Sequence, residues 1–106
     1  MSLGAIAAAP LYEISVNAQE RDGQVAIAPT ISAPSCTKLR YEILARRQGS
    51  SSASSRQSGN VTVGRDGIAS LSKLSFSVGA QDRCEVAIKV YQGASLVASR
   101  TEDCSR

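Results

Sequence analysis

Apolar and polar residues alternate at every second position through nearly the whole of this chain, and no segment keeps a helical period for long. The clearest run covers residues 39–46, where Leu39, Tyr41 and Ile43 are separated by Arg40 and Glu42. A period of two places successive side chains on opposite faces of a β-strand. The pattern therefore predicts strands that bury one face, and it argues against a helical fold.

Seven such runs are separated by turn signals rich in Gly, Asp and Pro, about 8 to 12 residues apart. This spacing predicts an all-β fold, a seven-stranded antiparallel β-sandwich, with a small barrel as the alternative. Pro29 predicts an edge or a bulge, and Ile68 and Leu71 predict a bulge because they lie out of register with Leu74. The Ser-rich stretch 48–56 predicts a flexible loop. The expected strands are 12–18, 25–31, 39–46, 57–63, 68–78, 84–91 and 95–101.

The chain has 106 residues, which is the length of one domain. Residues 1–10 are small and uncharged, and they lack the basic start of a complete signal peptide. We interpret them as a flexible leader, either the end of a signal sequence or an added start, before a single domain at 11–106. No apolar run approaches the roughly 20 residues of a membrane span, so no membrane partner is expected.

The composition removes several classes of function. Without His, the chain has no Ser-His-Asp or Cys-His catalysis and no mixed Cys/His zinc site. Its carboxylates form no pair at catalytic spacing, and it contains no glycine-rich phosphate loop. With no Trp, four other aromatic residues and a net charge of +3, it is a poor candidate for nucleic-acid binding. We expect a protein that is not an enzyme and has neither cofactor nor metal.

Three cysteines allow one disulfide and one free thiol. Cys84 begins the sixth expected strand and Cys104 follows the seventh, so a hairpin centred near Gly93 places them opposite each other. We expect this pair to form a disulfide, worth about 3 kcal/mol in the chain-entropy model. Cys36 lies at the other end of the sandwich and is expected to be free. The alternative is three reduced thiols, as in a cytosolic protein.

The third, sixth and seventh strands share a sheet in a sandwich of this order. Alternation directs polar side chains of these strands to the outer face of that sheet. Such a face is either an ordinary solvated surface or an electrostatic docking surface for an acidic partner. The candidate binding residues are Arg40, Glu42, Arg46, Lys89 and Tyr91.

The segment 41–63, YEILARRQGSSSASSRQSGNVTV, resembles the CsgH-type curli chaperones, which are relatives of CsgC. The shared features are a strand that begins with Tyr, here Tyr41, a Ser/Gly loop, here 49–55, and a Gln-Ser-Gly start to the next strand, here 57–59. The resemblance implies an immunoglobulin-like sandwich in the periplasm of Gram-negative bacteria. It also implies inhibition, without ATP, of premature amyloid assembly by the curli subunit CsgA.

Two departures from that family limit what the resemblance implies. The CxC motif of CsgC-type members is absent, so a thiol-redox role does not carry over. A first-strand cysteine of CsgH-like members is Tyr12 here, so the disulfide proposed above depends on strand geometry alone.

Part of the Ser-rich stretch matches the opening of the curlin repeat, Ser-x5-Gln-x-Gly. The matching residues are Ser51, Gln57 and Gly59, while the later Gly-Asn part of the repeat is missing. Chance in a Ser-rich loop accounts for the match. The alternative hypothesis is that the segment imitates a subunit repeat.

The function we predict is ATP-independent inhibition of curli amyloid assembly by transient electrostatic contact. The chain is expected to be a periplasmic monomer, secreted through a cleaved signal peptide that this sequence lacks, with a curli-type amyloid subunit as its partner. The alternative is a cell-surface or adhesive structural sandwich that works by strand addition at an open edge.

Overall fold

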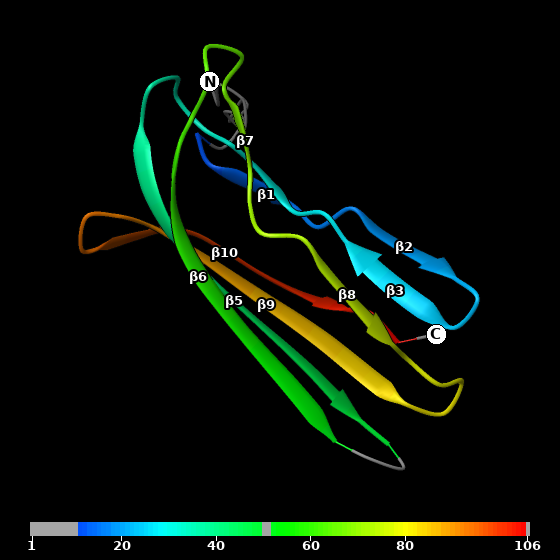
Figure 1. Ribbon diagram of the computed structural model, residues 1–106. Helices are drawn as coiled ribbons and strands as arrows, with labels where there is room; N and C mark the ends of the chain where they lie inside the picture. The colour runs from blue at the N-terminus through cyan, green and yellow to red at the C-terminus, as the bar shows by residue number, and fades with distance from the viewer. Residues whose placement is uncertain (1–10, 50–51, 106) are drawn as a thin grey trace, which may run out of the picture.

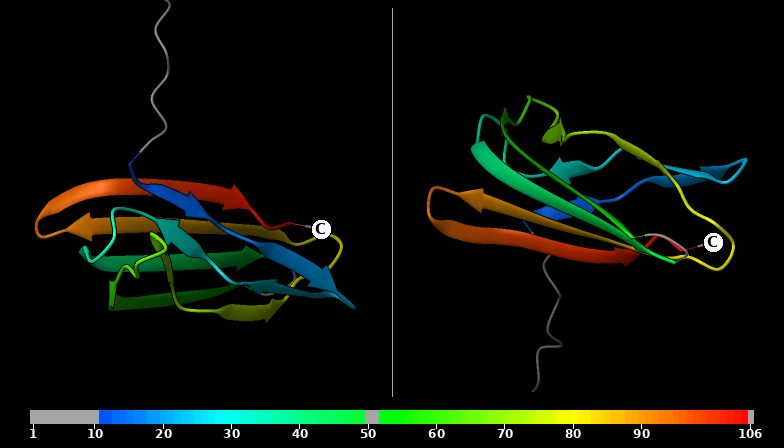
Figure 2. Two further views of the ribbon diagram at one scale, coloured as in Figure 1. Left: turned by 90° about the horizontal axis from the view of Figure 1, so that it is seen from above. Right: turned by 60° about the horizontal axis from the view of Figure 1, so that its bottom comes forward.

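The computed structural model describes residues 11–49 and 52–105, and within them the chain forms ten β-strands and no helix. The strands make two facing layers, as the right-hand view of Figure 2 shows. The expected all-β, antiparallel sandwich is confirmed. The predicted leader, residues 1–10, and Ser51 of the repeat-like segment lie outside the described part of the chain.

One layer is a four-stranded antiparallel sheet with the order β10-β9-β5-β6 (Figure 1). Its two central strands bury every second residue along most of their length, as a strand with one face on the core does. Their bounds are β5 (Lys38–Gln48), β6 (Ala53–Thr62), β9 (Arg83–Gln92) and β10 (Ser95–Asp103).

The other layer consists of two three-stranded sheets, ordered β1-β4-β7 and β2-β3-β8. The chain runs from one sheet into the other three times, so each of three expected strands is broken once. The strands are β1 (Glu13–Ser15), β2 (Ala18–Arg21), β3 (Gln24–Ile27), β4 (Thr30–Ser32), β7 (Ile68–Ser70) and β8 (Leu74–Ser77).

The predicted count of seven strands is therefore wrong, because three of the predicted runs are each split in two. Asn17 lies between β1 and β2 with a φ of 54°, and its side-chain amide donates to the Ala28 carbonyl across the break. Pro29 separates β3 from β4, and residues 71–73 separate β7 from β8. A positive φ or a missing N–H interrupts a ladder locally without changing the order of the strands.

The flexible loop predicted at 48–56 is also wrong for most of its length. β5 continues to Gln48, and β6 begins at Ala53, which pairs with Arg47. Serine is tolerated in an edge strand whose side chains are mostly exposed. The segment contains few apolar residues, and for that reason its sequence does not show the alternation typical of a strand.

The core lies between the two layers and is entirely apolar in the described residues. Side chains from β5 and β9 meet those of β3, β4 and β8, as expected for sheets packed face to face. The most completely buried side chains include Ile27, Ile31, Ile43, Val86, Ile88 and Val90.

A disulfide joins Cys84, at the start of β9, to Cys104, just after β10. The Cα atoms are 4.8 Å apart, and the Cys104 N–H donates to the Cys84 carbonyl at 3.0 Å. The bridge closes the open end of the β9–β10 hairpin. Cys36 is a free, exposed thiol in the turn before β5. No helix long and apolar enough to cross a membrane occurs in the described residues.

Candidate functional site

The candidate site is the outward side of the four-stranded sheet, which we call the exposed sheet face. β5 and β9 are its two central strands, and their antiparallel register decides which outward side chains are neighbours. Arg40 lies opposite Tyr91, and Glu42 lies opposite Lys89. These four predicted residues form two cross-strand pairs on one patch of the face. Arg46 lies further along β5, opposite Glu85.

Arg40 is held by two neighbours. Its Nη1 atom is 3.0 Å from Oε1 of Glu42, and its guanidinium carbon lies 4.4 Å from the centroid of the Tyr91 ring. Both partners of the ion pair are nearly half exposed, so the pair contributes little to stability. A cation over an exposed aromatic ring contributes roughly 0.5–1 kcal/mol. The arrangement therefore fixes the direction of the Arg40 side chain more than it stabilises the fold.

The exposed sheet face carries a concentration of positive charge. Alternation along the four strands places six of the chain's 12 basic residues there, together with three carboxylates. The carboxylates are Glu42, Glu85 and Asp103, and the basic residues are Lys38, Arg40, Arg46, Arg56, Arg83 and Lys89.

Sequence reasoning selected three of those six cations and missed Lys38, Arg56 and Arg83. The position of Arg56 follows from the pairing of β6 with β5, whereas the Ser-rich sequence around it predicts a loop. Lys38 and Arg83 lie at strand ends, where alternation alone does not show whether the strand has begun.

Asp103 is ionised near one corner of the face. Hydrogen bonds from the side chain and backbone of Ser105 hold the pKa of the Asp103 carboxyl below its usual value, and the charge of Arg83 acts in the same direction. The backbone N–H of Ser105 donates to the carboxylate at 2.8 Å. This fixed negative charge lies away from the Arg40 patch, at the end of the sheet closed by the disulfide.

Gln57 and Gly59 of the repeat-like segment do not lie on this face. Gly59 pairs with Tyr41, and both residues face the interior side of the sheet. A Cβ atom at Gly59 would lie 2.7 Å from the Tyr41 hydroxyl oxygen and 2.9 Å from Cζ. The Tyr41 hydroxyl is hydrogen-bonded to Ser72. Glycine is therefore required at this position by packing, whatever its part in a repeat.

Groups of acidic residues and cysteines that could hold a metal ion are absent from the described residues. Arg47, next to Arg46 in the sequence, points to the opposite side of the sheet and donates to the Ser77 carbonyl at 2.8 Å. The exposed sheet face thus offers six cations, of which Arg40 is held in place, together with an aromatic ring and hydroxyl groups. Such a surface suits reversible contact with a polar partner better than bond-making chemistry.

Comparisons with known proteins agree with this architecture. The model of a family described as thin aggregative fimbriae synthesis protein, Tafi-CsgC, matches residues 5–101. The curli protein CsgC of E. coli superposes with a TM-score of 0.71 at 24% identity, over 85% of this chain and 96% of that one. The solution structure of R. palustris CsgH gives a TM-score of 0.69 at 16% identity, over 87% of this chain and 91% of that one. The curated proteins contain no match.

Proposed function

This chain belongs to the Tafi-CsgC family of thin aggregative fimbriae synthesis proteins, and we propose that it inhibits premature amyloid assembly by the curli subunit CsgA in the periplasm. Family membership connects the chain with curli synthesis. The inhibitory step, the subunit and the compartment are our proposal. The protein acts as a monomer, without ATP and without a catalytic reaction.

The observation that carries the proposal is the basic, ordered exposed sheet face. Assembling amyloid chains expose unpaired strand edges and few charges, and they nucleate when such edges meet. The central strands β5 and β9 are hydrogen-bonded to a neighbour on both sides, so the middle of the face, between the edge strands β10 and β6, is a rigid platform. Cations fixed on it attract carboxylates of the subunit rapidly and release them readily.

Short-lived contact lowers the ratio of inhibitor to subunit that is needed for inhibition. Each inhibitor molecule meets many subunits in turn, and a subunit in contact with it is withheld from nucleation. Inhibition is therefore expected well below one inhibitor per subunit. A structural module that joins the fibre by strand addition, which is the second candidate function, requires one copy for every site it fills. The straight outer edge of β6 is the feature that favours this second candidate.

The composition of the fibrils separates the two functions. Purified CsgA is allowed to assemble with a small fraction of this protein, and pelleted and soluble material are compared by gel electrophoresis. The proposal predicts that the protein stays in the supernatant while assembly is delayed. Co-pelleting in fixed proportion to CsgA, rising towards one to one as more is added, would contradict it and establish the structural module.

A further inference from the structure

The two edge strands of the four-stranded sheet, β10 and β6, differ in how well they are protected from pairing with another strand. β10 has a register shift between Leu96 and Ala98, and Arg100 donates from Nη1 to the Ile14 carbonyl at 2.8 Å, which links this edge to the other layer. β6 has no register shift from Thr62 to Ala53. Bulges and covering contacts are the means by which proteins protect edges from pairing. Along residues 53–60 the β6 edge has no register shift and no hydrogen bond to the other layer.

The direction of the free backbone groups of β6 follows from one hydrogen bond. The Val63 N–H donates to the Thr37 carbonyl at 2.9 Å, and in an antiparallel pair such bonding residues alternate with non-bonding ones. Odd-numbered residues of β6 therefore bond to β5, and even-numbered ones direct their N–H and C=O groups outward. Within residues 52–62, the outward backbone groups without a hydrogen-bond partner are those of Ser54, Arg56, Ser58 and Asn60.

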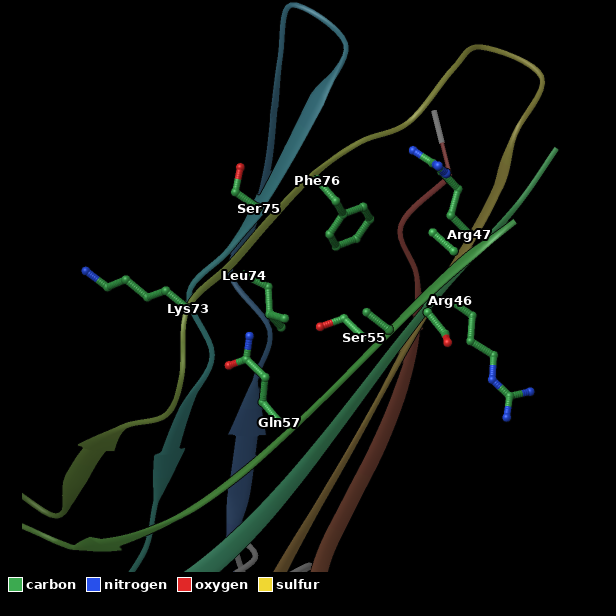
Figure 3. A pocket seen from close by; sticks show the side chains of 11 residues that line it. Arg46, Arg47, Ser55, Gln57, Lys73, Leu74, Ser75 and Phe76 are labelled. Atoms are coloured by element: carbon green, nitrogen blue, oxygen red, sulfur yellow. The ribbon is translucent and has the colours of Figure 1, made fainter. Parts of the chain in front are cut away.

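A hollow of about 190 Å³ opens beside this edge, between β6 and β8 (Figure 3). Ser55 and Gln57 face it from β6, and Leu74 and Phe76 face it from β8. Its volume is many times the roughly 15 Å³ that a single water needs, so it can take a side chain. The lining includes no carboxylate, and Arg47 and Lys73 lie at its margin, which we call the basic rim. The Lys73 amine extends away from the hollow, and the Arg46 guanidinium points to the exposed sheet face (Figure 3).

We propose that the β6 edge binds an extended segment of the amyloid subunit by strand addition. Backbone hydrogen bonds hold the segment to the even-numbered residues of β6, and one of its apolar side chains enters the hollow against Leu74 and Phe76. Alternate residues of a strand share a face, so a carboxylate two positions from that side chain lies at the basic rim. This inference rests on the proposed function and names the second contact through which it acts.

The probe is a ten-residue synthetic peptide of Ser, Gln, Asn and Gly that contains one Leu-x-Glu unit. Amide hydrogen exchange of the whole protein is followed by NMR with and without the peptide. Strand addition predicts slower exchange at Ser54, Arg56 and Ser58, and unchanged exchange at Gln57 and Gly59, which already bond to β5. Protection without this alternation, or none at all, would overturn the inference.

A proline variant removes one edge donor without touching the β5 ladder. Ser58→Pro is expected to weaken peptide binding at least about tenfold, because its N–H points outward and proline cannot supply it. Thr101→Pro is the matched control, since its N–H also points outward, but from the β10 edge. Both variants are checked by thermal melting. Equal loss of peptide binding in both variants would contradict the assignment to β6.

A second pair of variants preserves the backbone. Lys73→Glu is expected to weaken binding of the Glu-containing peptide about fivefold and to strengthen binding when Lys replaces Glu in the peptide. Arg65→Glu, an exposed charge in the turn before β7, is expected to change neither. Identical affinities for Lys73→Glu and wild type would exclude the basic rim as a contact.

Peptide binding is measured without fibrils, so the two proposals fail separately. A protein that delays CsgA assembly but binds no peptide at β6 overturns the edge inference alone. One that shows alternating protection but leaves CsgA assembly unchanged overturns the proposed function on which the inference rests.

Discussion

Replacing Arg40, Arg46 and Lys89 together with Glu is expected to raise the dose needed to delay CsgA fibril growth by about tenfold or more. The three cations lie on the two central strands of the exposed sheet face, and electrostatic attraction to such a face sets the rate of encounter. All three side chains are exposed, so the fold should survive the change. The lag time by thioflavin fluorescence measures the effect, and circular dichroism verifies folding.

A matched pair of variants separates the position of the charges from their number. Arg46→Glu with Lys89→Glu changes the net charge by the same amount as Arg21→Glu with Arg65→Glu, which lie off this face. Only the first pair should impair inhibition. Added salt should weaken wild-type inhibition as well, because exposed charges are screened, with CsgA alone measured at each salt concentration. Undiminished inhibition by the triple variant would show that this face is not the contact surface.

Loss of the Cys84–Cys104 disulfide should have the largest effect on stability. The bridge joins residues 20 apart, and a loop of this size is worth about 3 kcal/mol. For a domain of this length, each kcal/mol corresponds to about 4–8 °C in Tm, so Cys84→Ala with Cys104→Ala should lower Tm by roughly 12–24 °C. Both cysteines are buried, which adds the cost of lost packing. Calorimetry of the disulfide-bonded wild type and of the double variant measures the difference in Tm.

Cys36→Ser is the control for the disulfide variant. Cys36 is exposed and outside the bridge, so its replacement should leave Tm nearly unchanged. Its φ of 65° is retained by serine about as well as by cysteine. A double variant that melts with wild type, or a Cys36→Ser variant that loses as much stability, would contradict the stabilising role given to the bridge.

The sequence alone predicted the fold class because most strands bury one face, and such strands are recognised by apolar residues at every second position. The family resemblance drawn from 41–63 is confirmed by the match over 5–101. The interruptions were predictable only in part. The interruptions at Pro29 and between Ile68 and Leu74 are predictable from the sequence. The one at Asn17 is not, because an isolated Asn does not reveal that its φ is positive.

What escaped prediction lies mostly on β6. Its serines and exposed side chains hide the strand, since an edge strand with little to bury shows no apolar alternation. Missing this strand also left residues of the site unpredicted. Arg56 belongs to the exposed sheet face, and Ser55 and Gln57 line the hollow. The contact of Gly59 with Tyr41 and the inward turn of Arg47 depend on which strands are neighbours, and that is decided by the whole sheet.

The most direct test of the account is the lag time of CsgA assembly with this protein added at a small fraction of the subunit concentration. The thioflavin signal should stay flat for several times the lag of CsgA alone, and an equal mass of an unrelated basic protein should not reproduce the delay. An unchanged lag at every dose up to one protein per subunit would contradict the proposed function.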